Sequence, residues 1–267
     1  MRNSHQRETI NYWALIDVAK FLLLAGVIVG ILAVGTERLG YHWQWYRVER
    51  YIFTFENSRF TAGPLLQGLW ITFKITAVSM VLAFAFGLVT AIFRLSDSFA
   101  ARAVAWSYLE MIRNTPLLIQ LFFIYFVISP VVDISAFASA VLALSLFEGA
   151  YISEILRSGI VSIERGQWEA AHSLGMNTYQ TYRHVVLPQA ARRVLPPLTS
   201  QAISLIKDSA LVSTIAIYDL TMQGQAIIAE TFLAFEIWFT VAAIYLVVTG
   251  ALSFGVHALE ERLKAAY

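Results

Sequence analysis

The chain has 267 residues, of which 58% are hydrophobic and 14% charged, and its formal net charge at pH 7 is +1. Soluble globular domains carry about 25% charged residues, so this composition excludes a soluble globule, and the small net charge gives no basic surface for nucleic acid. Because the chain contains no cysteine, disulfide bonds, thiolate nucleophiles and cysteine-based metal sites are excluded as well.

The first predicted element is a membrane helix near residues 15–35. A polar segment, residues 1–20, leads into the apolar run from Phe21 to Gly35, an order that resembles a secretory signal. The polar lead is long, however, and carries Glu8 and Asp17. Several further apolar segments also follow, so we expect an uncleaved first helix.

The apolar segments predict an all-α membrane protein. A hydrocarbon core of about 30 Å needs around 20 helical residues, which must satisfy their backbone amides internally. On this basis we expect six spans, near residues 15–35, 65–93, 112–132, 136–156, 196–218 and 232–256. The second is longer than needed, so Phe60 to Gly68 could instead lie along the membrane surface. The fifth is interrupted by Lys207 and Asp208.

The distribution of Lys and Arg predicts the orientation, because cytoplasmic connections are enriched in these residues. One set of alternate connections holds twelve of them, at positions 2, 7, 94, 102, 113, 157, 165, 183, 192, 193, 262 and 264. The other set holds four, at positions 38, 47, 50 and 59. We therefore expect both termini to lie in the cytoplasm.

The first outer loop, residues 36–63, is rich in aromatic residues: Tyr41, Trp43, Trp45, Tyr46, Tyr51, Phe53, Phe55 and Phe60. Aromatic side chains commonly gather at the membrane interface, and this is the interpretation that we favour over a contact surface for an external partner. Residues 1–63 would thus form a cytoplasmic tail, a first helix and a periplasmic loop.

The cytoplasmic loop 157–193 is expected to contain two short helices. The first, from Gln167 to Leu174, should end at Gly175, which can adopt the left-handed conformation. The second can begin with Asn177 as its N-cap and Gln180 three residues later, the spacing of a capping box. We expect it to stop at Pro188.

The surface of this loop suggests docking onto another protein. Ala170 and Ala171 give the first helix a small-side-chain surface, with the charge of Glu169 at its edge. The second helix gathers apolar and aromatic side chains on one side, namely Tyr179, Tyr182, Val185 and Val186. The alternative is an amphipathic helix that only lies on the membrane surface.

The loop resembles the EAA motif of ABC importer permeases, in Glu169, Ala170, Ala171, Gly175, Val185, Leu187 and Pro188. The usual Ile is replaced by Val185. The segments 113–120 (RNTPLLIQ), 149–157 (GAYISEILR) and 205–211 (LIKDSAL) resemble the polar amino-acid branch of that family. The resemblance implies a type I importer core over residues 64–260, with residues 1–63 as an N-terminal extension and residues 261–267 as a cytoplasmic tail.

The resemblance also implies the partners. The loop, through residues 164–188, would insert into a cleft of a cytoplasmic ATPase dimer, and ATP with Mg²⁺ would bind there, because no lysine of this chain follows a glycine as a Walker A motif requires. A second permease subunit, identical or homologous, and an external solute-binding protein would complete an importer in the bacterial inner membrane. No cofactor is expected in this chain.

Ionisable residues inside the predicted spans are functional candidates, since each costs at least about 2.5 kcal/mol to insert. Five qualify: Lys74, Glu148, Lys207, Asp208 and Glu236. We expect Lys74 and Glu236, which can reach the span ends, to be structural. The hypothesis is that Glu148, Lys207 and Asp208, with Gln120, line the substrate path; the alternative is a polar network that only fixes packing.

These features predict a permease that moves a polar amino acid by alternating access and catalyses no reaction itself. The sequence contains no HExxH or GxSxG motif. Segment 113–116 is interpreted as the start of a helix, with Asn114 or Thr115 as its cap. The alternative function is an ion-coupled secondary transporter, with Glu148 and Asp208 as ion carriers, and a third is a membrane scaffold.

Overall fold

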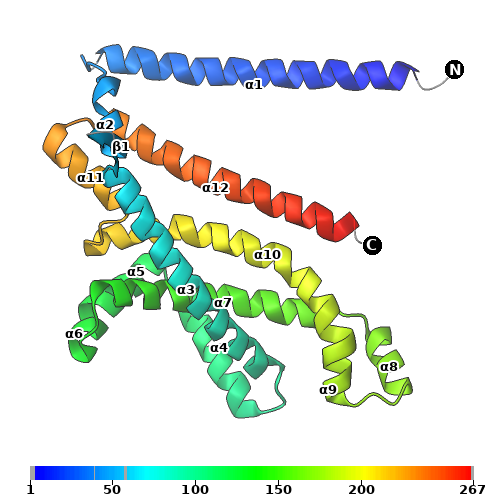
Figure 1. Cartoon of the computed structure of the whole chain (residues 1–267). Coiled ribbons are helices and arrows are strands. Elements are labelled where there is room, and N and C mark those ends of the chain that lie inside the picture. Colours follow the sequence, from blue (N-terminus) through cyan, green and yellow to red (C-terminus); the bar gives the residue numbers. More distant parts are fainter. Residues whose placement is uncertain (1–3, 39, 57–58, 266–267) are drawn as a thin grey trace. The chain divides into compact units, whose positions relative to one another are not determined.

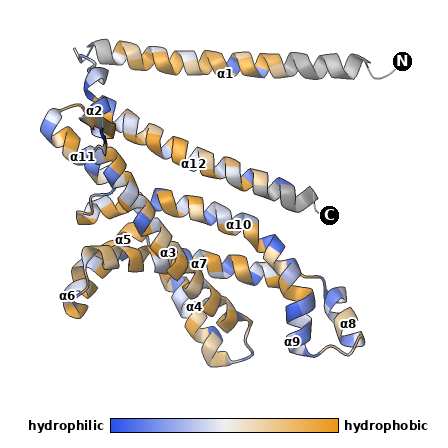
Figure 2. Ribbon diagram, viewed as in Figure 1, coloured by the Kyte–Doolittle hydropathy of each residue, from blue (hydrophilic) through white to orange (hydrophobic). Residues whose placement is uncertain are grey.

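The computed structural model describes residues 4–38, 40–56 and 59–265. The chain divides into two compact units, residues 1–45 and 46–267. The first unit is dominated by the helix α1 (Ser4–Arg38). Its segment Ala14–Gly35 is long and apolar enough to cross a membrane, and Figure 2 shows the hydrophobic residues along it. The predicted span at residues 15–35 therefore coincides with a helix of the right length and composition.

The second unit begins with an aromatic hairpin. The 3₁₀ turn η1 (Trp45–Arg47) and the short helix α2 (Glu49–Ile52) lead into the antiparallel strands β1 (Phe53–Glu56) and β2 (Arg59–Ala62). The rings of Phe53, Phe55 and Phe60 lie 5.7–6.0 Å apart. Part of the predicted outer loop is thus folded. The segment Phe60 to Gly68 is divided between β2 and the start of the helix that begins at Pro64, and its place along the membrane surface stays a prediction.

The central contact of the second unit joins α3 (Pro64–Leu95) to α7 (Ala136–Val161), as Figure 1 shows. Small residues allow this close approach. A Cβ atom added to Gly87 would lie 2.6 Å from Ile152 Cγ2, and one added to Gly149 would lie 2.9 Å from Phe86 Cβ. Both helices can cross a membrane by length and composition, in agreement with the predicted second and fourth spans.

The third predicted span is broken. Helix α4 (Phe99–Arg113) is followed by α5 (Leu117–Phe122), the π-helix η2 (Phe123–Ile128) and α6 (Ser129–Val132), and the two parts meet at 104°. The predicted spans leave residues 99–111 in a connection, and this prediction is wrong because these residues belong to α4. The break falls before Pro116, because a proline disfavours the α conformation of the residue that precedes it.

The predicted caps at this break are also wrong. Asn114 Nδ2 donates to the Glu110 carbonyl at 2.8 Å, and Thr115 Oγ1 donates to the Met111 carbonyl at 2.8 Å. Both side chains therefore close the end of α4, whereas Pro116 occupies the N-cap of α5 and provides no side-chain hydrogen bond there. Asn and Thr are common at helix termini, but here their side chains donate to carbonyls at the end of α4 and do not accept from amides at the start of α5.

The remaining helices are α8 (Arg165–Ser173), α9 (Thr178–Thr181), the π-helix η3 (Tyr182–Val186), α10 (Leu187–Asp208), the 3₁₀ helix η4 (Ser209–Ile215), α11 (Leu220–Thr231) and α12 (Ala234–Ala265). Within the described ranges, four single helices suit a membrane span, in α1, α3, α7 and α12, and the bent pair around Pro116 would be a fifth. The span predicted at residues 196–218 falls on α10 and η4, which do not meet that test, so it stays a prediction.

Candidate functional sites: a projecting corner and polar groups within the helices

The predicted docking loop forms a projecting corner built from α8 and α9 (Figure 1). Helix α8 ends at Ser173 with Leu174 as its C-cap, and the next residue, Gly175, has a left-handed φ of +74°, as predicted. The Met176 amide donates to the Ala171 carbonyl at 3.1 Å, and the Gly175 amide donates to His172 at 2.9 Å. This geometry satisfies carbonyls at the helix end and sets the turn into α9.

The start of α9 is the predicted capping box. Asn177 Oδ1 accepts from the Gln180 amide at 2.9 Å, and the Asn177 amide donates to Gln180 Oε1 at 3.0 Å. Two amides of the first turn are thereby satisfied reciprocally. The prediction of an N-terminus at Asn177 is confirmed.

The predicted stop at Pro188 is wrong, since the helical path continues from α9 through η3 into α10. Just before the proline, the Leu187 amide donates to the Tyr182 carbonyl, five residues back. Proline lacks an N–H group, and its ring collides with the carbonyl four residues earlier. The wider π turn accommodates the residue in the first turn of α10, where no intrahelical donor is needed.

The corner is packed against the start of α10. Ile163, Val186 and Ala190 form a small core, with Trp168 and Tyr182 packed against it, and Ala171 is buried as well. Two polar contacts add to this core: Gln189 Nε2 donates to Gln167 Oε1 at 3.2 Å, and Arg193 donates to Ser162 Oγ at 3.0 Å.

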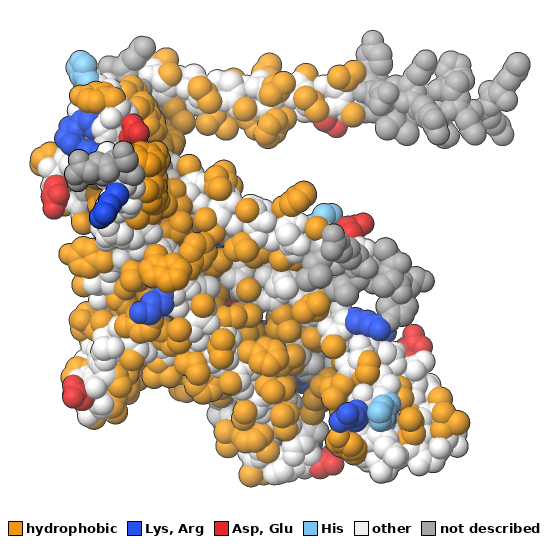
Figure 3. Space-filling view, in the orientation of Figure 1, with side chains coloured by type: hydrophobic (Ala, Val, Ile, Leu, Met, Phe, Trp, Pro, Cys, Tyr) orange, Lys and Arg blue, Asp and Glu red, His pale blue; other side chains and the backbone are white. Residues whose placement is uncertain are grey.

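This packing divides the motif residues into two sets. Ala171 turns inward and Val185 is partly buried, whereas the exposed ones are Glu169, Ala170, Gly175, Leu187 and Pro188. Ala170 and Ala171 therefore do not share the outer surface that the sequence suggested. Figure 3 shows charged and His side chains over this corner, beside the largely hydrophobic helices.

A second site lies between α7 and α10 and is acidic. Glu148 is fully buried; its Oε2 accepts from Gln201 Nε2 at 2.5 Å, and its Oε1 has no hydrogen-bond partner. The Asp208 carboxyl interacts with that of Glu148. No described Lys or Arg forms an ion pair with either carboxyl group. A positively charged group beside this pair would therefore be stabilised.

One residue that contacts the acidic pair, Gln201, is not among the predicted site residues. Gln201 precedes Asp208 by seven residues, a spacing that places both on one face of α10. That spacing could have identified it. The Lys207 side chain, by contrast, is exposed, so the structure does not bring it into this cluster.

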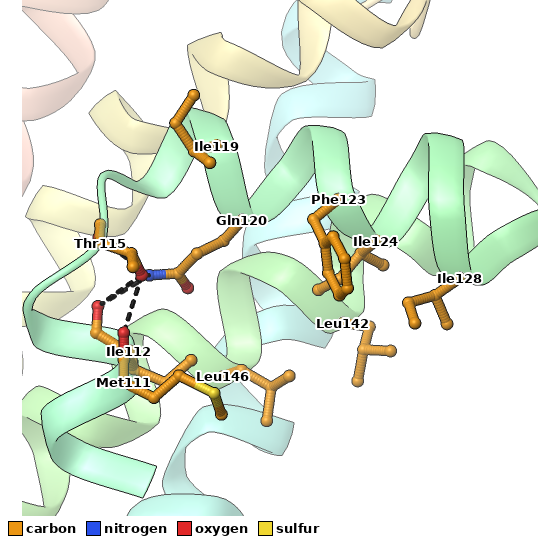
Figure 4. A pocket seen from close by; sticks show the side chains of 10 residues that line it. All are labelled: Met111, Ile112, Thr115, Ile119, Gln120, Phe123, Ile124, Ile128, Leu142 and Leu146. Atoms are coloured by element: carbon orange, nitrogen blue, oxygen red, sulfur yellow. Dashed lines mark hydrogen bonds between the residues drawn. The ribbon is translucent and has the colours of Figure 1, made fainter.

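Gln120 lies at a third place, the elbow between α4 and α5 (Figure 4). Its Nε2 donates to the Ile112 and Thr115 carbonyls and to Thr115 Oγ1, at 2.7, 3.0 and 2.8 Å. The elbow borders a pocket of about 510 Å³, lined by Met111, Ile112, Thr115, Ile119, Gln120, Phe123, Ile124, Ile128, Leu142 and Leu146. Glu148 is two residues from Leu146, or about 200° around α7, so the pocket and the acidic pair lie on different faces of that helix.

The other charged groups within the helices contact neighbouring side chains or are buried in the helix packing. The Lys74 ammonium lies 5.4 Å from the centre of the Phe137 ring, and Glu236 is buried in the first turn of α12. Glu154 pairs with Arg94 of α3 and, at 2.7 Å, with Arg157. Glu154 is not among the predicted functional residues, although its spacing of three residues from Arg157 is typical of a helical ion pair.

The family model described as binding-protein-dependent transport system inner membrane component matches residues 80–265. The chain belongs to this family. The glutamine transport system permease protein GlnP of Escherichia coli K12 is 40% identical over 75% of this chain and 93% of its own length. The L-cystine transport system permease protein TcyB of Bacillus subtilis is also 40% identical, over 75% and 87%.

Solved structures agree with this membership. The crystal structure of an amino acid ABC transporter with histidines is 39% identical, with a TM-score of 0.71 over 74% of this chain and 94% of the other. An inward-facing MetNI methionine ABC transporter, 21% identical with a TM-score of 0.62 over 74% and 95%, shares the fold. This inner membrane component therefore has the predicted all-α fold of type I ABC importer permeases, and an ion-coupled secondary transporter is not favoured. The match begins inside α3, so α1 and the hairpin lie outside it.

Proposed function

We propose that this inner membrane component is the permease subunit of an ATP-driven importer and carries a polar amino acid inward by alternating access. The 40% identity to permeases named for glutamine and L-cystine supports an amino-acid substrate. A second permease subunit, identical or homologous, would complete the pathway. An external solute-binding protein would deliver the substrate.

The observation that carries the proposal is the folded corner of α8 and α9. Its capped helices, positive-φ glycine and small core make it rigid, and a rigid element can transmit movement of a partner to the helices that it is packed on. The exposed residues Glu169, Ala170, Gly175, Leu187 and Pro188 would contact the ATPase dimer, with Ala171 and Val185 supporting them from within. ATP and Mg²⁺ would bind to that partner.

The substrate path belongs to the same proposal. Glu148 and Asp208 would meet the ammonium group of the amino acid, since they present acidic oxygens without a cationic ion-pair partner among the described residues. Gln120 and Lys207 would line other parts of the path. The alternative is a polar network that fixes only the packing of α7 on α10.

The coupling role can be tested on the chain purified with its co-purifying ATPase and reconstituted with the external binding protein. Gly175→Trp and Glu169→Ala should each reduce binding-protein-stimulated ATP hydrolysis at least tenfold. Ser158→Ala is the matched control, because Ser158 is exposed in the same loop 157–193 and lies outside the coupling segment 164–188. If neither motif variant weakens stimulation or assembly, the corner does not couple the two subunits.

A further inference from the structure

The hairpin of β1 and β2 has one aromatic face. Phe55 pairs with Phe60 across the strands and Phe53 pairs with Ala62, and opposite residues and residues two apart point to the same side of a sheet. The rings of Phe53, Phe55 and Phe60 accordingly lie together, and we call them the aromatic face. Phe55 is 69% exposed and Phe60 58%, so nothing within the described chain covers this face.

The aromatic face rests on a firm support. The Gly63 amide donates to the Ile52 carbonyl at 2.8 Å, and a Cβ atom added to Gly63 would lie 2.6 Å from the carbonyl carbon of Tyr51. The next turn is fixed as well, because Leu65 is fully buried in a cluster with Leu220. The hairpin is therefore held against the start of α3.

The hairpin and the corner lie at opposite ends of the second unit. Helices α3 and α7 run parallel, since Ser145 Oγ donates to the Ser79 carbonyl at 3.2 Å and Glu154 pairs with Arg94 further along both helices. The corner follows the end of α7, whereas the hairpin precedes the start of α3 (Figure 1). If the corner contacts a cytoplasmic ATPase, the aromatic face is external.

The hydrocarbon core of a membrane fits between Lys74 and Arg94 on α3. The Lys74 ammonium lies 5.4 Å from the centre of the Phe137 ring in the first turn of α7, so α7 begins level with Lys74. The interval of about 20 residues from Lys74 to Arg94 rises about 30 Å, which is the thickness of the core. Residues 64–73 thus project about 15 Å beyond it, and a tilt of about 20° changes this little.

The aromatic face is thereby kept out of the hydrocarbon. The headgroup layer is only about 5–8 Å deep, so Gly63 lies beyond it. Phe60 is about 10 Å of strand from Gly63, so even a hairpin folded back along α3 would bring the rings no deeper than the headgroups. Exposed apolar clusters outside the membrane mark surfaces that bind other proteins.

Arg50 adds a positive charge at the base of the hairpin. Its Nη2 donates to Tyr51 Oη at 2.8 Å, and its guanidinium carbon lies 4.9 Å from the centre of the Tyr51 ring. No described carboxylate forms an ion pair with it. Aromatic residues and arginine contribute most to the binding energy of protein interfaces, and an arginine without an ion pair favours an acidic group on the partner.

We propose that the aromatic face, with Arg50 at its edge, is a docking surface for the external solute-binding protein, which would present an apolar hollow with an acidic rim. The inference rests on the proposed function, in which that protein delivers the substrate. It adds a contact made by residues that precede the family match, which begins at residue 80.

The first test titrates the binding protein against the chain and its ATPase in lipid nanodiscs and follows stimulated ATP hydrolysis. The double variant Phe55→Ala, Phe60→Ala should raise the half-saturating concentration at least tenfold and leave the maximal rate within twofold, because the corner is intact. Arg50→Glu should raise it at least fivefold, and less at high salt. Phe99→Ala is the matched control, since Phe99 is 82% exposed and lies in α4, at the opposite end of α3.

The second test uses the absence of cysteine from the chain. Phe55→Cys in nanodiscs should react with a water-soluble maleimide within threefold of the rate of Thr61→Cys, an exposed position on the other face of the hairpin. Saturating binding protein should slow the reaction of Phe55→Cys at least fivefold and that of Thr61→Cys less than twofold.

The outcomes separate the two proposals. If the double variant keeps its half-saturating concentration or loses only maximal rate, or if the binding protein leaves Phe55→Cys unprotected, the aromatic face is not the docking surface and the importer proposal stands. Slow labelling of Phe55→Cys without the binding protein would show that lipid or a second copy of the chain covers the face, and would also overturn the inference. If the binding protein stimulates no hydrolysis by the wild-type complex, both proposals fall.

Discussion

Glu148 carries a buried carboxyl group that no described Lys or Arg pairs with. Its carboxyl is fully buried, one oxygen accepts from Gln201, and the other has no partner. Because ionisable groups within membrane spans are costly, such a residue is retained most readily where it contacts a substrate or ion. The acidic pair with Asp208 would suit an ammonium group.

Glu148→Gln is therefore expected to reduce amino-acid uptake at least tenfold while the membrane level of the protein stays normal. The carboxamide keeps the shape and can still accept from Gln201, so the change removes mainly the charge. Uptake and abundance should be measured together, with Lys207→Met, whose side chain is exposed, for comparison, and Glu230→Gln, an exposed carboxyl, as control. Normal uptake in both Glu148→Gln and Lys207→Met would contradict the proposed path and favour a packing role.

Asp219 lies outside the predicted membrane-spanning segments, and its protonation affects the stability of the folded protein. Its side chain is buried at the N-cap of α11, and burial raises the pKa of this carboxyl to about 6, although the Met222 amide, which donates to it at 2.8 Å, lowers the pKa in part. The folded state thus holds the proton more tightly than the unfolded chain does. The resulting stabilisation is complete below pH 4 and is lost as the pH rises through 6.

Asp219→Asn should remove this pH dependence. Asparagine keeps the N-cap acceptor without the charge, so thermal unfolding of the purified protein should show a variant that is about 2 kcal/mol more stable than the wild type at pH 7.5, with a smaller difference at pH 5. Asp97→Asn, at an exposed position, is the matched control and should show no such trend. An equal difference at both pH values would exclude protonation of Asp219 as the cause.

At the scale of elements, the corner of α8 and α9 offers two glycines with opposite expectations. Gly175 has a φ of +74°, where an L-residue is strained, whereas Gly166 lies within α8 with open space around it. Gly175→Ala should destabilise the corner by about 1 kcal/mol, and Gly166→Ala should stabilise it by up to about 1 kcal/mol. Hydrogen exchange of the amides in residues 165–187 would measure both. Slower exchange in Gly175→Ala would contradict the expected backbone strain at that residue.

Pro188 and Pro130 each follow a π-helix, and this local geometry is a feature of the helices that the sequence could not predict. The corner's caps were predictable because glycine and the Asn177–Gln180 spacing act locally. Pro188 is predicted to end a helix, yet the helical path continues from η3 into α10. Pro130 has the same surroundings, because the π-helix η2 directly precedes the helix α6 that contains it. A proline tolerates either a break or a widened turn, and the choice depends on packing that lies outside the local sequence.

The candidate sites were predictable to a similar extent. Charge inside an apolar run was enough to single out Glu148 and Asp208, which do lie together. The exposure of Lys207 and the separation of Gln120 from the acidic pair depend on helix rotation and on the bend at Pro116, which hydropathy does not encode. Ala171 turned inward for the same reason: the motif shows which residues matter, and tertiary packing decides which of them face a partner.

At the scale of the whole molecule, the second unit contains its own core. The buried clusters of the described residues all lie within residues 46–267, and the family match begins at residue 80. The hairpin belongs to this unit physically. Tyr51 and Ile52 pack against the cluster around Leu65 and Leu220, and the Gly63 amide donates to the Ile52 carbonyl at 2.8 Å. The functional boundary should therefore fall before the hairpin rather than at the start of α3.

Shortening the chain to residues 46–267 should preserve ATPase assembly and amino-acid uptake within about twofold, because it removes α1 and keeps every buried cluster. Shortening it further to residues 64–267 should lower both by at least tenfold, since Tyr51 and Ile52 would no longer cover the cluster around Leu65 and the apolar area that they bury would be exposed. The measurement is uptake per unit of membrane-inserted protein, with insertion followed by protease accessibility of the corner at residues 165–187. Loss of uptake by residues 46–267, at normal abundance and orientation, would show that α1 takes part in transport. Full uptake by residues 64–267 would show that the hairpin is dispensable and that the working core begins at α3.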